Sequence, residues 1–452
     1  MTKNKTINIT QDPVNTVLRR LTVPMIAGIL GMVAFNLADT YFVGNLGTFQ
    51  MAALSFTFPV VLVIGSINTG LGIGASAVIS KAVGEQEKQK VIRLSTDSLT
   101  LGLLISIITA TAGLLTIDPL FKLLGADDKT LPYIQEYMRI WYIGVPFVVI
   151  PMIGNNAIRA LGDTKTPSVV MLVAAGLNIV FDPLLIMGVG FFPQMGVSGA
   201  ALATVISRAI TFLFALYILI IREKVISLNK IKIKKLLQSW KAILFIGLPN
   251  AIAKMIIPLG TGIITGLIAS YGTDAVAGFG IATKIEFFAL SVVNAFVAIV
   301  PVYVGQNFGA KKIDRIKKAL SSSEKFSVLN GVILFVILAI LARPISYLFT
   351  NDDKVVDKIV LYLRIVPIGY AFMGIVLIIN GALNALQRPI KAASVNLIQM
   401  LVVYIPLAVL TSKYFGIYSI FISLVASYVI VAIGAHIFFK KDLNKISLSL
   451  KE

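Results

Sequence analysis

Long apolar runs, repeated along almost the whole chain, constrain its fold more than any other feature. Of the 452 residues, 57% are hydrophobic and only 13% are charged, which is about half the charged fraction of an average soluble domain. A run of about 18 or more apolar residues is long enough to cross the roughly 30 Å hydrocarbon core of a bilayer as a helix. The runs lack the alternating ten-residue pattern of a membrane β-barrel. The sequence therefore predicts an all-α membrane protein without disulfides, because it has no cysteine.

The number of runs and the distribution of charge predict the topology. Twelve spans are centred near residues 33, 66, 104, 145, 178, 208, 257, 290, 332, 371, 401 and 428. Both termini and five loops then lie on one side, where 28 of the 40 Lys and Arg residues are found, against six in the opposite loops. Basic loops face the cytoplasm. We therefore predict a multi-pass protein of the cell inner (plasma) membrane with cytoplasmic termini, and we read the net charge of +19 as an orientation signal with some attraction to membrane lipids, not as nucleic-acid binding.

The two halves of the chain resemble each other. A shift of 225 residues aligns them without a gap over about 140 residues. The matching pairs include Pro24 with Pro249, Asp127 with Asp352, Tyr137 with Tyr362, and Asn155 with Asn380. We predict a six-helix amino-terminal lobe (1–221), a basic cytoplasmic linker (222–241) and a six-helix carboxy-terminal lobe (242–452). Two parallel repeats of this kind are typical of an alternating-access carrier.

Polar residues inside three spans of the first half suggest a cation site. Asp39 lies within the first span, Asn178 and Asp182 share one face of the fifth span, and Thr204 lies in the sixth. With a rise of ~1.5 Å per residue, Asp39, Asp182 and Thr204 lie roughly 7–12 Å below the outer boundary. Their oxygens suit a small hard cation such as Na⁺, or one proton shared between two carboxylates. The alternative is that they are unrelated polar residues in contact with water.

The second half lacks this set. Its repeat partners of Asp39, Asp182 and Thr204 are Ile264, Leu407 and Leu424. It offers instead Lys254 and Glu286, which we expect to form a structural ion pair or to face a substrate.

A few other residues complete the predicted machinery. Pro24, in the first span, invites a helix bend. Arg208, midway along the sixth span, either neutralises a carboxylate or lines the cavity. The candidate substrate-cavity residues are Phe35, Asn36, Tyr137, Arg208, Lys254 and Glu286.

Taken together, these motifs resemble one known family. The Asn36–Gly44 stretch, Pro24, the Asn178-x₃-Asp182-Pro183 motif and the Gly199–Thr204 run, with the six-plus-six duplication, resemble the multidrug and toxic compound extrusion (MATE) family. The resemblance is to the prokaryotic branch with an acidic residue in the first helix. It implies that Asp39, Asn178, Asp182 and Thr204 bind the coupling cation and that a bend at Pro24 accompanies protonation.

The resemblance also implies what the protein transports. It predicts a monomeric efflux antiporter, without cofactor, that exports amphipathic and often cationic organic compounds against inward H⁺ or Na⁺. The sequence does not choose between these two cations or name the physiological substrate.

Other functions fit the sequence less well. A flippase for lipid-linked oligosaccharides shares the two-lobe plan, but only Arg208, Lys254 and Lys284 are candidates to line its cavity with positive charge. An intramembrane aspartyl hydrolase using Asp39 and Asp182 would need a Gly-x-Gly-Asp signature, which the chain lacks. An ATP-driven pump would need a phosphate-binding Gly-x₄-Gly-Lys-Ser/Thr loop, which is also missing.

Overall fold

The structure is a computed structural model that describes residues 8–44, 46–190, 192–227 and 232–449. This described part is helical, and twelve of its helical segments are long and apolar enough to cross a membrane. The predicted all-α, twelve-span fold is therefore confirmed. The span predicted near residue 290 is interrupted there, because Leu290 separates α8 (Thr273–Ala289) from α9 (Ser291–Gly309).

The chain divides into two compact units, which we describe separately. The amino-terminal unit is Leu21–Ala251, and the carboxy-terminal unit combines Ile252–Glu452 with the described part of Met1–Arg20. The predicted linker, 222–241, lies inside the first unit, and its residues 228–231 are outside the described ones. The lobe boundary predicted from the repeat stays a prediction.

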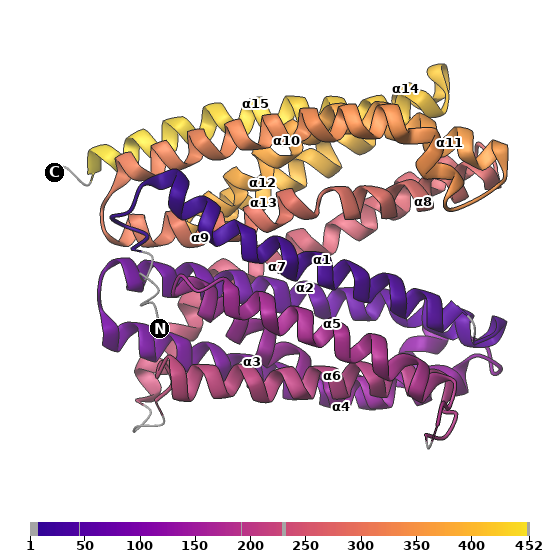
Figure 1. Ribbon diagram of the computed structural model, residues 1–452, viewed down its shortest axis with the longest axis horizontal. Coiled ribbons are helices and arrows are strands. Elements are labelled where there is room, and N and C mark those ends of the chain that lie inside the picture. Colours follow the sequence, from indigo (N-terminus) through magenta and orange to yellow (C-terminus); the bar gives the residue numbers. More distant parts are fainter. Residues whose placement is uncertain (1–7, 45, 191, 228–231, 450–452) are drawn as a thin grey trace. The chain divides into compact units, whose positions relative to one another are not determined.

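Helix α4 is the centre of the amino-terminal unit. The helices of this unit are α1 (Val14–Gly44) from Leu21 onward, α2 (Thr48–Gly84), α3 (Lys88–Leu123), α4 (Leu131–Ala160), α5 (Lys165–Ile186), α6 (Gly196–Tyr217), the π-helical turn η1 (Ile218–Arg222) and the first part of α7 (Ile233–Ala269). Helix α4 packs against α2, α3 and α6, and α5 packs against α6 (Figure 1). The apolar core lies mainly on α2, α3 and α4. Polar side chains of α1, α5 and α6 are therefore free to form a site beside that core.

Small residues bring α1 close to α5. A Cβ atom added to Gly28 would lie 2.9 Å from the Cα atom of Ser168, so no larger residue fits there without a shift. The Ser168 hydroxyl also donates a hydrogen bond to the Met25 sulfur at 3.4 Å. Pro24 lies within α1, which is helical throughout Val14–Gly44. Asp39 is therefore about four helical turns beyond Pro24 along α1.

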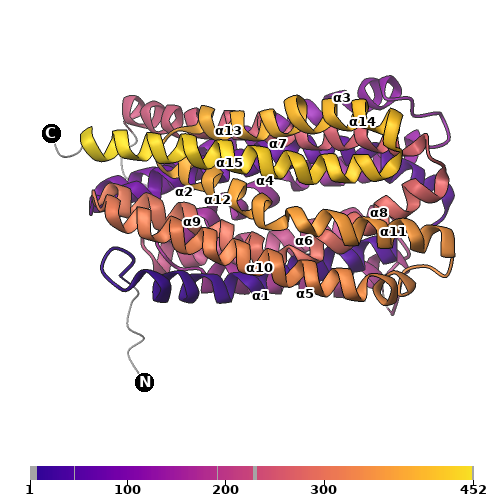
Figure 2. The ribbon, with the colours of Figure 1, turned by 90° about the horizontal axis from the view of Figure 1, so that it is seen from above.

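In the carboxy-terminal unit, α12 (Tyr370–Ala385) packs against the largest number of neighbouring α-helices. The helices of this unit are the second part of α7, α8, α9, α10 (Ile313–Tyr347), α11 (Asp353–Ile365), the 3₁₀ turn η2 (Val366–Gly369), α12, α13 (Pro389–Leu397), the π-helical segment η3 (Ile398–Tyr404), α14 (Ile405–Phe415) and α15 (Ile417–Ser449). Helix α12 packs against α9, α10 and α15, and α11 packs against α8 and α10 (Figure 2). In the repeat alignment, α11 to α12 correspond to α4, so equivalent helices lie at the centre of each unit.

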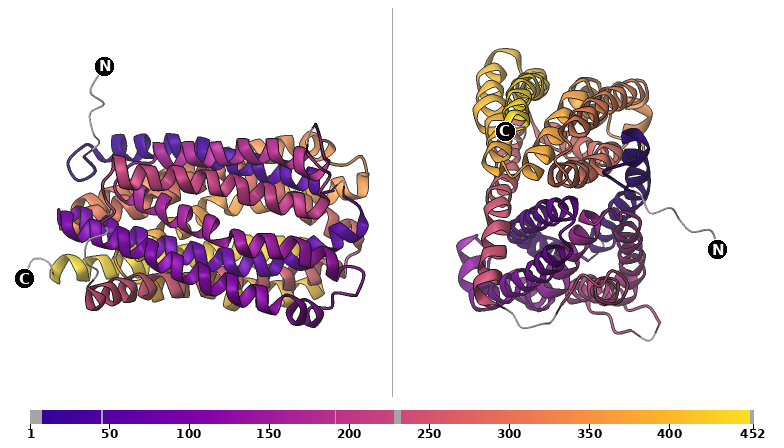
Figure 3. Two further views of the ribbon diagram at one scale, coloured as in Figure 1. Left: turned by 90° about the horizontal axis from the view of Figure 1, so that it is seen from below. Right: turned by 90° about the vertical axis from the view of Figure 1, so that its left-hand side faces the viewer.

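The segment before α1 is fixed within the carboxy-terminal unit. The Arg315 guanidinium donates to the carbonyls of Ile9 and Asp12. The Lys312 ammonium donates to the Thr10 carbonyl at 2.9 Å. In the views of Figure 3, the helices within each unit run side by side along its length.

Candidate functional site

The predicted acidic and amide residues of α5 are buried. Asn178 is 1% exposed and Asp182 is 0% exposed. They lie one helical turn apart, so their side chains leave the same face of α5. Asp39 on α1 and Thr204 on α6 are partly buried. All four belong to the amino-terminal unit.

The hydrogen bonds around these residues are incomplete. The Asn178 amide donates to the Thr204 hydroxyl at 3.5 Å, which links α5 to α6. Both carboxylate oxygens of Asp182, the amide oxygen of Asn178 and the hydroxyl of Ser207 are buried without a hydrogen-bond partner among the described residues. A buried polar group left unpaired costs about 1–3 kcal/mol. Four such atoms in one region therefore indicate a place where a proton or a cation would be stabilised.

Asp39 belongs to the same electrostatic environment. Its charge acts on Asp182, and both carboxylates act on Tyr137, which α4 contributes. Two nearby carboxylates favour an occupant that reduces their mutual repulsion. Asp39 on α1, Asp182 on α5 and Tyr137 on α4 therefore lie within electrostatic range of one another.

A small cavity lies next to the Asn178–Thr204 contact. It holds about 20 Å³, which is room for one water-sized ligand and not for a drug-sized molecule. Its lining includes Phe35, Asn178, Thr204, Ser207 and Arg208. The Arg208 guanidinium lies over the Phe35 ring, 5.7 Å from its centroid, which is a cation–π geometry.

The side chains of this region offer oxygen donors. The oxygens come from carboxylate, amide and hydroxyl groups, which are hard ligands. No group of three or more His, Cys, Asp or Glu side chains that suits a metal ion occurs within the described ranges. A site with two carboxylates can instead change between charged and neutralised states.

The remaining predicted residues are placed differently. Asp39, Asp182, Asn36 and Tyr137 do not line the small cavity. Lys254 and Glu286 belong to the carboxy-terminal unit, where the Lys254 side chain is exposed.

The ion pair expected between Lys254 and Glu286 is wrong. Within the described part of the chain, Glu286 accepts a hydrogen bond from the Tyr362 hydroxyl and forms no ion pair with Lys254. Tyr362 in turn packs edge-on against Phe279 and Phe421. Sequence separation hid this contact, since α8 and α11 are far apart along the chain.

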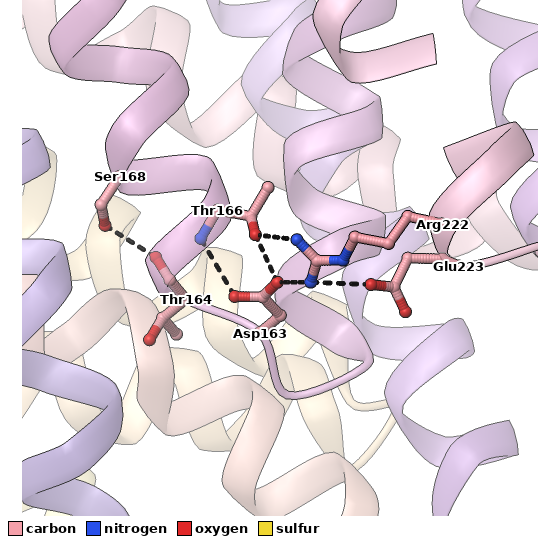
Figure 4. Close-up of polar contacts among 6 residues, drawn as sticks. All are labelled: Asp163, Thr164, Thr166, Ser168, Arg222 and Glu223. Atoms are coloured by element: carbon pink, nitrogen blue, oxygen red, sulfur yellow. Dashed lines mark hydrogen bonds and ion pairs between the residues drawn. The ribbon is translucent and has the colours of Figure 1, made fainter. Parts of the chain in front are cut away.

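An ionic cluster at one end of α5 and α6 fixes the two helices that carry the site (Figure 4). The Arg222 guanidinium, at the end of η1, pairs with Asp163 and Glu223 and donates to the Thr166 hydroxyl at 2.6 Å. Burial raises the pKa of Asp163, but the hydrogen bonds from Thr166 and the Arg222 charge outweigh this effect and hold the pKa below its usual range. Asp163 is therefore ionised at neutral pH and keeps the start of α5 next to the end of α6.

Sequence reasoning missed Ser207, Met32 and Met171 as cavity residues. For Ser207 a signal existed, because Thr204, Ser207 and Arg208 are spaced at i, i+3 and i+4 and share one helix face. Met32 and Met171 carry no such signal, since methionine is a common filler of apolar helices.

The chain is similar to known proteins over nearly its full length. The MatE family model matches residues 24–184 and 249–410. The two stretches begin at Pro24 and Pro249, which the repeat alignment pairs with each other. A relative from Shewanella oneidensis, named as an FAD transporter, is 35% identical over 424 residues that cover 94% of each chain. The multidrug export protein MepA of Staphylococcus aureus is 28% identical and covers 94% of this chain and 93% of its own.

Solved structures match over nearly the full length. A point mutant of the Vibrio cholerae MATE transporter VcmN superposes with a TM-score of 0.91 at 28% identity, covering 96% of this chain and 97% of the other. The bent form of VcmN gives a TM-score of 0.90 at 29% identity, with coverage of 96% and 98%. An outward-facing MATE transporter of the MOP superfamily, at 24% identity and a TM-score of 0.92, shares the fold.

Proposed function

The chain belongs to the MatE family, and from this premise we propose that it is a secondary active exporter of organic compounds, driven by inward H⁺ or Na⁺ at the Asp39–Asp182 site. The family consists of membrane transporters, so the intramembrane hydrolase considered from the sequence is excluded. We propose cation-coupled multidrug efflux as the specific activity of this chain.

One observation carries the proposal. The Asp182 carboxylate is fully buried, neither of its oxygens has a hydrogen-bond partner of ordinary geometry within the described residues, and the donor that acts on it is the Asn178 side chain. An ionised carboxylate in such surroundings is costly unless it is paired, and ionisable groups inside a membrane mark ion and proton pathways. A coupling cation would remove this cost on binding and restore it on release.

The change of charge explains how the site could drive transport. When Asp39 and Asp182 are neutralised, they can be packed against apolar surface; when they are charged, they favour contact with water. We propose that this difference biases the position of α1, with Pro24 allowing the helix to bend, and that the carrier alternates between outward and inward access. One cation moving down 100 mV supplies ~2.3 kcal/mol, which supports about a fiftyfold gradient of a neutral substrate.

Of the predicted cavity residues, those of the amino-terminal unit are assigned to the substrate, while a substrate-facing role of Lys254 and Glu286 stays a prediction. Phe35 and Arg208 form a stacked aromatic–cation pair beside the site. We propose that these two residues, together with Asn36 and Tyr137, contact the substrate and change position when the cation site is occupied or emptied. We keep Na⁺ and H⁺ as alternatives, with Asn178 and Thr204 as further oxygen ligands for Na⁺.

Transport in proteoliposomes tests the proposal. Purified protein is reconstituted, and efflux of a fluorescent organic cation is measured under a Na⁺ gradient or a pH gradient imposed separately. We expect one gradient to drive efflux in the wild type and Asp39→Asn and Asp182→Asn to abolish the coupling. Asp118→Asn, which changes a carboxylate hydrogen-bonded to Gln135 on a different part of the unit, is the matched control. Coupled efflux by Asp182→Asn at the wild-type level would refute the proposal.

A second candidate substrate has a specific observation in its favour. The relative named as an FAD transporter is 35% identical to this chain, whereas the multidrug exporters of Staphylococcus aureus are 28% identical. FAD is a bulky anion, so it would be bound by cations such as Arg208 and not by carboxylates. Loading the proteoliposomes with FAD and with ethidium in parallel separates the two substrate classes: competition between them indicates one shared path.

The rest of the predicted cell biology stays a proposal. The described helices support a multi-pass membrane protein. Cytoplasmic termini, the inner membrane and function as a monomer follow from the sequence alone. A flippase for lipid-linked oligosaccharides shares the fold expectation, but no contact in the described residues favours it.

A further inference from the structure

The amino-terminal unit has a second polar cavity, which lies between the amino-terminal ends of α3 and α7. It holds about 550 Å³, far more than the space beside Asn178, and its walls are the first turns of α3, the start of α7 and Ser227. We propose that this cavity is a binding site for a phosphate-bearing anion and that Arg93, Lys232 and Lys235 are the residues that hold it.

The walls of the cavity are fixed by hydrogen bonds. The Ser227 amide donates to the Thr96 hydroxyl at 3.1 Å. The Trp240 indole donates to the Asp97 carbonyl at 3.0 Å and to the Thr100 hydroxyl at 3.3 Å. These bonds attach the segment before α7, and α7 itself, to α3. The cavity is therefore a defined space between two helices; residues 228–231 have no part in the proposal.

The charges on the walls favour an anion. Four basic and two acidic residues line the cavity, and they are Lys90, Arg93, Lys232, Lys235, Glu87 and Asp97. Lys90 is already paired with Glu85 at 2.6 Å and with Glu87 at 3.6 Å. Arg93, Lys232 and Lys235 form no ion pair among the described residues, and the Arg93 Nε atom is buried without a hydrogen-bond partner there. Asp97 offsets part of this charge, so three cations without an ion pair face one carboxylate.

The helix ends act in the same direction. Helix α3 begins at Lys88 and α7 begins at Ile233, and the two helices are 36 and 37 residues long. The start of a helix carries the positive end of the helix dipole, which favours an anion nearby. In α3 the amides of Lys88 and Lys90 already donate to the carbonyls of Gln86 and Glu87, so the side chains of one arginine and two lysines are the proposed phosphate donors.

Two sources can supply this phosphate chemistry. One is the headgroup of an anionic phospholipid, which basic pockets at the cytoplasmic membrane surface bind. The other is a soluble phosphate compound. The lipid source rests on the proposed orientation, which places this end of α3 at the cytoplasmic leaflet. Binding itself does not depend on the coupling cation, so a failure here is distinct from a failure of the Asp39–Asp182 proposal.

Native mass spectrometry of the purified full chain tests the site. Phosphatidylglycerol and phosphatidylcholine with the same acyl chains are titrated, and inorganic phosphate is added as a competitor. We expect phosphatidylglycerol to bind more tightly than phosphatidylcholine, and the double variant Arg93→Gln/Lys235→Gln to lose about thirtyfold in affinity. Lys234→Gln, on the same turn of α7 but outside the cavity lining, should bind as the wild type does, and Lys235→Arg should retain binding because it keeps the charge.

The results distinguish a lipid headgroup from a soluble phosphate compound, and they also include outcomes that would overturn the proposal. Phosphatidylglycerol binding that inorganic phosphate does not displace supports the lipid headgroup. Displacement by inorganic phosphate that depends on Arg93 and Lys235 supports a soluble phosphate compound at the same site. Equal binding of the two lipids, with no phosphate effect, would overturn the proposal, as would a double variant that binds like the wild type while remaining folded by size-exclusion chromatography.

Discussion

The two units of the molecule surround their buried carboxylates differently. In the amino-terminal unit, Asp182 is fully buried and its oxygens have no hydrogen-bond partner within the described residues. In the carboxy-terminal unit, Glu286 is partly buried and accepts a hydrogen bond from Tyr362. We therefore propose that Asp182, whose oxygens are unpaired, belongs to a binding site, and that Glu286, which the protein supplies with a donor, makes a structural contact.

The repeat makes this difference more informative. Tyr137 and Tyr362 occupy equivalent positions in the repeat alignment, and each lies near the acidic groups of its own unit. The acidic residues themselves are not equivalent, because the partners of Asp39 and Asp182 are Ile264 and Leu407. The tyrosine is therefore present in both units, whereas the carboxylates lie on helices that are not equivalent in the repeat: α1 and α5 in one unit and α8 in the other. Among these carboxylates, Asp182 is fully buried, with both carboxylate oxygens unpaired within the described residues.

The largest expected effect separates the two carboxylates. With one cation per neutral substrate, the wild type should reach about a fiftyfold gradient at 100 mV. Asp182→Asn should reach a ratio near one, because an amide does not bind and release a cation in the same way, whereas Glu286→Gln should keep most of the wild-type gradient. Steady-state substrate ratios in proteoliposomes give the comparison directly. Equal losses in both variants would show that the units do not differ in this respect.

A smaller effect is expected from the hydroxyl on α6. Thr204→Val removes the acceptor of the Asn178 amide and a candidate cation ligand while keeping the side-chain volume similar. We expect the concentration of coupling cation needed for half-maximal transport to rise about five- to tenfold, for a lost contact worth about 1 kcal/mol. Thr211→Val, in which the lost hydroxyl bonds only to the Arg208 carbonyl of the same helix, should change it much less. The prediction fails if both variants behave alike.

The carboxy-terminal contact should affect stability more than transport. Tyr362→Phe removes the hydrogen bond to Glu286 and should lower the free energy of unfolding by about 1–3 kcal/mol. The control is Tyr303→Phe, because the Tyr303 hydroxyl is buried without a partner among the described residues and its removal should cost little. Thermal unfolding in detergent measures both. Loss of coupling in Tyr362→Phe with unchanged stability would give Glu286 a transport role.

The smallest effect concerns the cluster that fixes α5 and α6. The pKa of Asp163 is held below its usual range, so its contribution to stability is present at neutral pH and is lost as the pH falls through the folded-state pKa. Asp163→Asn should therefore lower the thermal midpoint by a few degrees at pH 7, and the difference should shrink below about pH 4. Asp128→Asn, an exposed carboxylate in the loop before α4, is the control. A difference that does not vary with pH would mean that Asp163 acts through packing and not through charge.

The sequence predicted much of the fold because the membrane imposes it. A span needs a long apolar run, and an intact run leaves no alternative to a helix. The pairing of Asn178 with Asp182 on α5 could also be predicted, since residues at i and i+4 of a helix share a face. The contacts of Phe35 with Arg208 and of Glu286 with Tyr362 were not, because they depend on how closely α1 approaches α6 and α8 approaches α11. Hydrophobic pattern does not encode these distances.

The predicted ion pair between Lys254 and Glu286 was wrong for the same reason. Lys254 and Glu286 lie in spans at similar depth, but depth alone does not fix the direction of a side chain. In the structure Lys254 is exposed, and a tyrosine provides the donor to Glu286. Nothing in the sequence marked Tyr362 as that donor, since aromatic residues are common in membrane helices.

Cation release from the purified protein tests the central claim most directly. The protein is held in weakly buffered detergent solution, and the protons or Na⁺ ions released on addition of a transported substrate are counted. We predict about one cation per molecule for the wild type and for Glu286→Gln, and none for Asp39→Asn or Asp182→Asn. Full release by Asp182→Asn would contradict the account, because the amino-terminal site would then not hold the coupling cation.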